Sequence, residues 1–328
     1  MRLLAITQSP DDASTRHRLG LHVPHLAAAG VAVRAVEWPR DEEPRRAVVA
    51  SAADFDAVLV QRRLLPVGHA LALRRTARRL AYDFDDAVIL RDFAGWYPLP
   101  LADKLVQFAA LVSSCDAVTA GNGYLAGLAA RFAPRRRVAV VPTVVDADRF
   151  APPAEPREPP TVLGWIGQRS TLPYLSAIAG ALSRLARRRP GLTLRCIADA
   201  APGIPGLPVE LRRWTLVGEP TDLASLDVGL APLADDPWTR GKCGLRLLQY
   251  LAAGVPALAS AAGVQAEIAS SGAAVSVRRP GDWASALHGL LTDGALRRRL
   301  STAGPALVRS RFTPAVWADA VRRAWCGR

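Results

Sequence analysis

Short apolar runs alternate along the whole chain with longer segments in which apolar residues recur at helical spacing. This alternation is typical of βα units built around a parallel sheet. It predicts helices at residues 15–29, with a kink at Pro24, and at 101–113, 244–253 and 314–325. It predicts strands at residues 3–7, 31–37, 57–60, 79–84, 117–120 and 138–141, and then at 161–166, 192–198, 214–217, 228–231, 257–259 and 274–277.

The alternation breaks at residues 150–160, which contain five prolines. Proline cannot sit inside a helix or a central strand, so this stretch is interpreted as an interdomain linker. A chain of 328 residues also exceeds the usual size of one core. We expect an N-terminal domain at residues 1–152, a C-terminal domain at 153–312, and a last helix at 313–328 that packs outside the second sheet or crosses back to the first domain.

The two halves predict an α/β fold in which ligands bind in an interdomain cleft, because parallel sheets bind ligands beyond the carboxyl ends of their strands. Half the residues are hydrophobic, yet no stretch approaches the roughly 20 apolar residues of a membrane-spanning helix. The start does not resemble a signal peptide, and the four cysteines lack paired metal spacing. A soluble, cytoplasmic protein without a structural metal is expected.

The net charge of +13 would attract nucleic acid, anionic lipid or phosphorylated substrates. Arginines scattered through alanine-rich helices account for most of it, and such runs are usually solvated faces. The sequence shows no motif that combines aromatic and basic residues for nucleic-acid recognition. Nucleic acid is therefore not an expected partner, whereas peripheral contact with a membrane stays open.

The most informative stretch is residues 227–256. It predicts a buried strand, a polar loop that carries Asp235, Asp236, Arg240 and Lys242, and a helix that begins near Gly244. Free backbone N–H groups at the start of that helix, with two cations beside them, would cradle a diphosphate. The alternative is a surface loop whose charged side chains only remain in water.

This stretch, together with residues 141–150 and 165–170, resembles the retaining glycosyltransferases of family 4, which have the GT-B fold of two Rossmann-like domains. The resemblance covers most of the chain. It implies sugar transfer from a nucleotide-diphosphate donor to a glycan, a lipid-linked acceptor or a small molecule, without a metal or other cofactor. It places the donor at the segment from Arg240 to Gln249, which includes Lys242, Cys243, Gly244 and Leu245.

Two departures from the family pattern bear on mechanism. The family's Glu-x7-Glu motif aligns with Gly241 and Gln249, so Gln249 would hold the donor ribose, and Asp235 or Asp236 would replace the first Glu unless activity is altered or lost. The family's phosphate-binding Arg aligns with Arg169, but no Lys follows it. Lys242 or Arg240 would then supply the missing cation.

A second cluster, Asp83, Asp85 and Asp86, ends a predicted strand. Neighbouring carboxylates repel one another, so cations, hydrogen bonds or a raised pKa must stabilise some of them. The resemblance places Asp85 and Asp86 where many members carry a His-Asp pair near the transferred sugar. Asp85 would bind sugar hydroxyls or stabilise the developing positive charge. In the structural alternative Asp86 caps a turn and Asp83 pairs with an Arg, which is the favoured interpretation for Asp83.

The loop after the first strand contains Ser14, Arg16 and Arg18. Ser14 is a good N-cap for the helix that follows, and Arg16 or Arg18 would reach donor phosphate or an anionic acceptor. Asn122, at a later strand-to-helix turn, is expected to cap its helix.

Overall fold

The computed structural model describes residues 1–9, 11–90, 101–152 and 157–327. These residues form two compact units. Unit 1 contains Met1–Val144, Asp236–Cys243 and Pro314–Arg328, and unit 2 contains Val145–Asp235 and Gly244–Thr313. The expected linker falls partly on residues 153–156, which lie outside the described residues.

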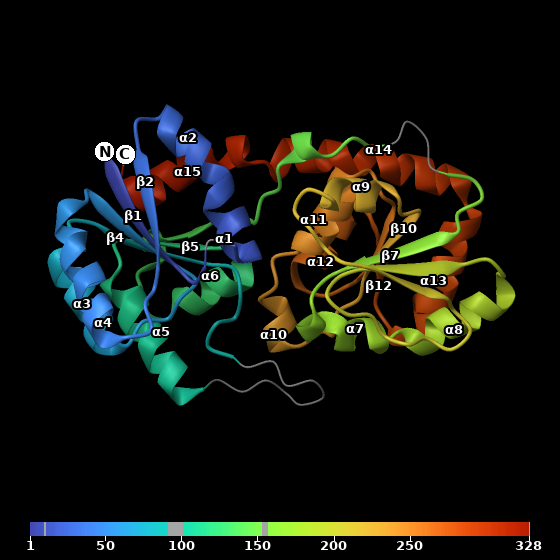
Figure 1. Cartoon of the computed structure of the whole chain (residues 1–328), viewed down its shortest axis with the longest axis horizontal. Coiled ribbons are helices and arrows are strands. Elements are labelled where there is room, and N and C mark those ends of the chain that lie inside the picture. The colour runs from blue at the N-terminus through green and yellow to red at the C-terminus, as the bar shows by residue number, and fades with distance from the viewer. Residues whose placement is uncertain (10, 91–100, 153–156, 328) are drawn as a thin grey trace. The chain divides into compact units, whose positions relative to one another are not determined.

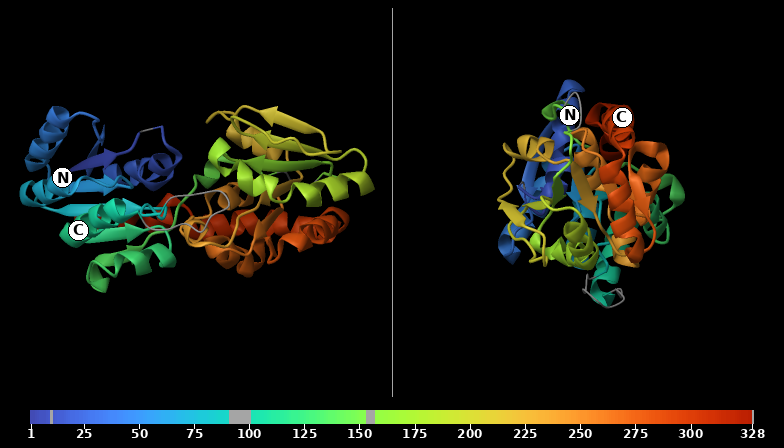
Figure 2. Two further views of the ribbon diagram at one scale, coloured as in Figure 1. Left: turned by 90° about the horizontal axis from the view of Figure 1, so that it is seen from below. Right: turned by 90° about the vertical axis from the view of Figure 1, so that its right-hand side faces the viewer.

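The division differs from the expected domain bounds in two respects. Unit 2 begins at Val145, whereas the second domain was expected to begin at residue 153. The segment Asp236–Cys243, which the sequence places in the second domain, belongs by its contacts to unit 1. The first strand and the last helix also both lie in unit 1 (Figure 2).

Unit 1 is built on a six-stranded sheet in the order β2-β1-β3-β4-β5-β6, and every neighbouring pair is parallel. The central strands are buried along nearly their whole length, whereas the edge strand β2 is largely exposed. Helices on both faces explain why the central strands are continuous apolar runs. The strands are β1 (Arg2–Thr7), β2 (Ala32–Glu37), β3 (Ala57–Gln61), β4 (Leu80–Phe84), β5 (Ala117–Ala120) and β6 (Val138–Val140).

Helices lie on both faces of this sheet (Figure 1), and an apolar cluster of side chains lies on each face. One cluster joins the sheet to α3 (Glu42–Ser51), α4 (Val67–Thr76), α5 (Ala102–Ser114) and α6 (Gly123–Ala129). The other joins it to α2 (Val23–Ala28) and α15 (Pro314–Cys326). The last helix therefore packs on the first sheet.

The predicted helix at 15–29 is in fact two helices. The first, α1 (Ala13–Arg18), is followed by a 3₁₀ turn at Gly20–His22 and then by α2. Pro24 lies in the first turn of α2, where its missing N–H costs no hydrogen bond. The N-cap of α1 is Asp12, whose carboxylate accepts from the backbone N–H groups of Ser14 and Thr15, so the prediction that Ser14 is the cap is wrong.

Unit 2 repeats the design with a parallel sheet in the order β12-β11-β10-β7-β8-β9. One apolar cluster joins the sheet to α7, α8 and α13, and another joins it to α11 and α12, with α14 packed on α11. The strands are β7 (Val162–Ile166), β8 (Thr193–Ile197), β9 (Val209–Arg212), β10 (Val228–Ala231), β11 (Ala257–Ser260) and β12 (Val275–Val277). The helices are α7 (Leu172–Ser176), α8 (Ala179–Arg188), α9 (Glu219–Ala224), α11 (Leu245–Ala252), α12 (Gly263–Ile268), α13 (Trp283–Thr292) and α14 (Gly294–Arg311).

One predicted strand is wrong. Residues 214–217 form no strand, and a turn lies at residues 216–218. The edge strand is instead β9, which begins five residues earlier than the predicted one. The sequence of β9 alternates apolar and charged residues, and Leu211 is half exposed, as an edge strand allows. Within the described ranges, no helix is both long and apolar enough to cross a membrane.

Candidate functional site

The carboxylates of unit 1 have two separate environments. Asp83 is buried inside β4, and its carboxylate pairs with Arg18, at 2.5 Å from one guanidinium nitrogen and 3.0 Å from Nε. Thr119 donates a further hydrogen bond to Asp83 over 2.6 Å. The prediction that Asp83 pairs with an Arg is therefore confirmed. Arg18 is 2 % exposed and so does not face a ligand, contrary to its expected contact with phosphate.

Asp85 follows the carboxyl end of β4 and is the last member of a hydrogen-bonded series of polar side chains. Ser14 Oγ donates to Asp85 Oδ1 over 2.6 Å, and Gln61 Nε2 donates to Ser14 Oγ over 2.8 Å. Thr15 Oγ1 donates in turn to Gln61 Oε1 over 3.1 Å. Desolvation, followed by repulsion from Asp86, raises the pKa of Asp85 to about 6, although Arg62 and Arg18 favour its ionised form.

This raised pKa gives a prediction for stability. The folded state binds the Asp85 proton more tightly than the unfolded state does, so the contribution of Asp85 to stability is greatest below pH ~4 and is lost as the pH rises to about 6. Asp85→Asn keeps a neutral side chain of the same shape. We expect it to raise the free energy of unfolding by about 3 kcal/mol at pH 7.5, from 1.36 kcal/mol per pKa unit, and to change it little at pH 4. Urea denaturation at both pH values measures this, and an equal effect at both would contradict it.

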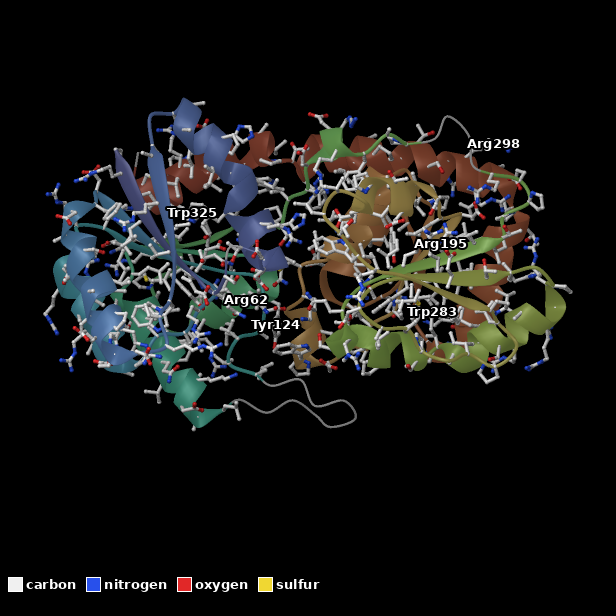
Figure 3. The ribbon with its side chains drawn as sticks, viewed as in Figure 1. Arg62, Tyr124, Arg195, Trp283, Arg298 and Trp325 are labelled. Carbon is white, nitrogen blue, oxygen red and sulfur yellow. The ribbon has the colours of Figure 1, made fainter. Side chains whose placement is uncertain are left out.

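Asp86 lies between two cations. Its carboxylate oxygens are 2.6 Å from an Arg62 guanidinium nitrogen and 2.9 Å from Lys242 Nζ. Arg62 also pairs with Asp12 at 3.2 Å (Figure 3 labels Arg62). The backbone of Arg62 has a φ of 59°, a left-handed conformation that is costly for a residue with a side chain. Asp86 is therefore an ion-paired residue.

The segment 236–243 is fixed against the carboxyl ends of β4 and β5. Its short helix α10 (Pro237–Arg240) is capped by the Asp236 carboxylate, which accepts from Thr239 N over 2.8 Å. Asn122 Nδ2 lies 3.2–3.3 Å from the carbonyl oxygens of the last three residues before Cys243, and Asn122 Oδ1 caps α6 as predicted. Cys243 Sγ donates to the carbonyl of Asp85 over 3.2 Å.

The packing of this segment constrains position 241, with which the sequence resemblance aligned a glutamate. A Cβ atom on Gly241 would lie 2.8 Å from both the backbone nitrogen and the Cβ of Ala87, which is closer than side-chain atoms approach. A glutamate at Gly241 therefore does not fit this arrangement of the backbone.

The structure separates the predicted site residues into two groups. Unit 1 brings together Asp85, Asp86, Lys242 and Cys243, with Asp236 in the same segment as a helix cap. In that unit Arg240 is exposed, and Arg16 donates to the carbonyl of Asp11 over 2.5 Å. Unit 2 contains the remaining predicted residues, which are Arg169, Gly244, Leu245 and Gln249.

In unit 2 the predicted ribose residue is buried and has a carboxylate partner. Gln249 Nε2 donates to Glu219 Oε2 over 3.0 Å, and Trp214 Nε1 donates to the same oxygen over 2.7 Å. Glu219 is 2 % exposed. Arg169 is 76 % exposed in its side chain and lies 3.8 Å from Asp199.

Sequence reasoning missed four residues that shape these groups, namely Ser14 as a partner of Asp85, together with Arg62, Glu219 and Arg246. The positive φ of Arg62 has no sequence signal because the residue is not glycine. Arg246 stood inside the donor motif, but its position in a helical pattern gave it no separate role. Among the described residues, no group of three or more His, Cys, Asp or Glu side chains could hold a metal ion.

No protein-family model matches the chain, and no curated protein matches it in sequence. Solved structures do match it. Anabaena HepE (Alr3699), solved in complex with UDP, superposes with a TM-score of 0.74 and 15 % identity over 98 % of this chain and 99 % of its own. The chain has the GT-B fold. WaaG, a glycosyltransferase involved in lipopolysaccharide biosynthesis, gives a TM-score of 0.67 at 15 % identity over 98 % and 99 % of the two chains. A glycosyltransferase from Rickettsia africae gives 0.71 at 11 % identity over 98 % of each.

The predicted GT-B fold is therefore confirmed, and its two Rossmann-like halves are the sheets of units 1 and 2. In this GT-B chain Asp85 and Asp86 follow the carboxyl end of β4, and Arg169 follows that of β7. The carboxyl ends of parallel strands are where such sheets bind ligands. Cys243 contacts Asp85, and Arg246 contacts the last residue of β7.

Proposed function

We propose that this protein is a glycosyltransferase that takes a sugar from a nucleotide-diphosphate donor. The observation that carries the proposal is the GT-B fold shared along nearly the whole chain with HepE, which was solved with UDP and with UDP-glucose. The polar residues that follow the strand ends in both units support it. Family 4 membership, a hexosyl donor and retention of anomeric configuration are parts of the same proposal, taken from the sequence resemblance.

Unit 2 would bind the donor, with Gln249 near the ribose, and the carboxylates of unit 1 would act at the sugar. Asp85 is the better candidate of the two carboxylates, because Asp86 is already neutralised by Arg62 and Lys242. An ionised Asp85 would stabilise positive charge that develops at the anomeric carbon. Asp236 is a weaker candidate, since its carboxylate caps α10. No metal or cofactor is part of the proposal.

The acceptor class is proposed only as a glycan, a lipid-linked molecule or a small molecule. A cytoplasmic location with peripheral contact to anionic membranes would suit a lipid-linked acceptor and the net charge of +13. Co-sedimentation with vesicles of anionic and neutral lipid tests that contact directly. Binding that is equal for both lipids would remove the electrostatic argument.

Thermal unfolding of the purified protein with UDP, GDP, ADP and their sugar conjugates tests donor binding. A ligand that binds only the folded state at 100 times its Kd adds about 2.7 kcal/mol to the free energy of unfolding. We expect one nucleotide class to raise the Tm selectively, with DNA as the control for simple charge attraction. A shift with DNA and none with any nucleotide would overturn the proposal.

A second candidate function is favoured by Gly241. The chain has no glutamate at that position and no room for one against Ala87, so it is also a candidate for a nucleotide-sugar-binding protein without transferase activity. Incubation with the stabilising sugar nucleotide and a broad acceptor panel separates the two. Release of the free nucleotide with a new glycoside supports transfer, whereas tight binding without transfer or hydrolysis supports the second function. The anomeric configuration of the glycoside, determined by NMR, then tests retention.

A further inference from the structure

Arg246 occupies an unusual position in unit 2. It lies in the first turn of α11, and its guanidinium is 4.7 Å from the centre of the Trp165 ring. Nε donates to the carbonyl of Ile166, the last residue of β7, and a terminal nitrogen donates to Thr171 Oγ1 over 3.0 Å. The cation is thus held firmly at the carboxyl end of a central strand.

Arg246 is partly buried and has no carboxylate partner among the described residues, unlike the two fully buried arginines, Arg18 and Arg297. Arg18 pairs with Asp83, and Arg297 pairs with Glu158. Burial lowers the pKa of the Arg246 guanidinium. Burial also disfavours the charged form of Arg18, but its anionic neighbours, Asp83 foremost, together raise its pKa. Even a partly buried charge loses hydration, and an opposite charge compensates that loss best. The two acceptors of Arg246 are neutral, so its charge is left for an anion to balance.

Two glycines adjoin Arg246, one packed against its side chain and one at the start of its helix. A Cβ atom at Gly167 would lie 2.7 Å from a terminal nitrogen of Arg246 and 2.4 Å from the Trp165 ring, so only glycine fits there. The helix α11 begins after Gly244, whose φ of 74° suits glycine, and no described side chain caps its first N–H groups. Uncapped helix starts beside an arginine are favourable sites for phosphate oxygens.

We infer that Arg246 is the cation that binds the diphosphate of the donor. This inference rests on the proposed function, and it assigns to Arg246 the phosphate-binding role that the resemblance suggested for Lys242 or Arg240. Lys242 belongs to unit 1 and is paired with Asp86 there. The resemblance implies two phosphate-binding cations after β7, but Arg169 is followed by no lysine there. Arg246, on α11, would supply the second cation.

The test compares Arg246→Met with Arg298→Met, which removes an equal charge from an exposed position in the same unit (Figure 3 labels Arg298). Calorimetric titrations use UDP, GDP and ADP, the matching nucleosides, and inorganic pyrophosphate. Loss of a charge-assisted hydrogen bond should weaken binding of the preferred nucleoside diphosphate by roughly 10- to 100-fold. Nucleoside affinity should change less than about twofold, and Arg298→Met should behave like the wild type.

Arg246→Lys is the second variant. The lysine keeps the positive charge but cannot form the bidentate hydrogen bonds of a guanidinium. Arg246→Lys should therefore bind the diphosphate more tightly than Arg246→Met and more weakly than the wild type. The Tm of each unliganded variant shows whether the fold is intact. Unchanged diphosphate affinity in Arg246→Met, or an equal loss for diphosphate and nucleoside, overturns the inference and leaves the proposed function standing.

The wild-type protein separates the remaining outcomes. If it binds pyrophosphate through Arg246 but no nucleoside diphosphate, the anion site is supported and the proposed function fails. If it binds neither, both are overturned.

Discussion

Replacing Arg18 with methionine is expected to lower the free energy of unfolding by about 3–5 kcal/mol, because it leaves the Asp83 carboxylate buried without its cation. Both side chains are almost completely inaccessible, at 1 % and 0 % exposure. Arg18 also donates to the carbonyl of Val141 over 2.5 Å, so the substitution removes a second buried contact. Urea denaturation followed by circular dichroism measures the loss.

Arg46→Met is the matched control for this substitution. Arg46 pairs with Glu42 at 3.0 Å, but both side chains are more than half exposed, so we expect a change of less than about 0.5 kcal/mol. The double variant Arg18→Met/Asp83→Asn removes both charges and should recover a large part of the loss. A double variant that is no more stable than Arg18→Met would show that packing, and not the unpaired charge, is the cause.

Replacing Trp325 with alanine is also expected to lower the free energy of unfolding by about 3–5 kcal/mol. Trp325 is 1 % exposed, packs edge-on against His22 with ring centroids 5.9 Å apart, and belongs to the apolar cluster that joins α15 to the first sheet (Figure 3 labels Trp325). Its indole Nε1 donates to Thr119 Oγ1 over 3.0 Å, and Thr119 in turn donates to Asp83. The substitution therefore opens a cavity beside the buried ion pair.

Val316→Ala on the same helix is the control for Trp325→Ala, since Val316 is 49 % exposed and should cost less than about 1 kcal/mol. Thermal and urea unfolding of both variants compare the two positions. Equal losses would mean that Trp325 is not anchored as described. Trp325→Ala and Arg18→Met should not add independently, because a continuous series of hydrogen bonds joins their sites.

The sheets were predictable because a buried parallel strand must be apolar on both faces, which leaves a clear local signal. The strand 57–60 was found almost to the residue, and β3 spans Ala57–Gln61. The same argument explains the one missed strand, because β9 lies at the edge of its sheet and its alternation of apolar and charged residues is a weak signal.

The site was predictable only in part, because its partners are distant in sequence. Asp85 and Asp86 could be singled out from their local spacing. Their partners Ser14 and Lys242 lie 71 and 156 residues away, and no local pattern specifies such contacts. The sequence motif from Arg240 to Gln249 is continuous, yet the structure divides it between two units after Cys243. That division depends on packing against Ala87 and Asn122, which only the folded chain shows.

Unit 1 is assembled from segments that are far apart in the chain, and this affects the order in which its parts can fold during translation. Its sheet is encoded in the first 140 residues, but α15, which covers one face of that sheet, is encoded after all of unit 2. During translation the face of the first sheet that α15 later covers would therefore stay exposed to solvent until unit 2 has been synthesised. We therefore expect ribosome-bound chains that stop before Pro314 to recruit holdase chaperones to this face, and release of the completed chain to end that association.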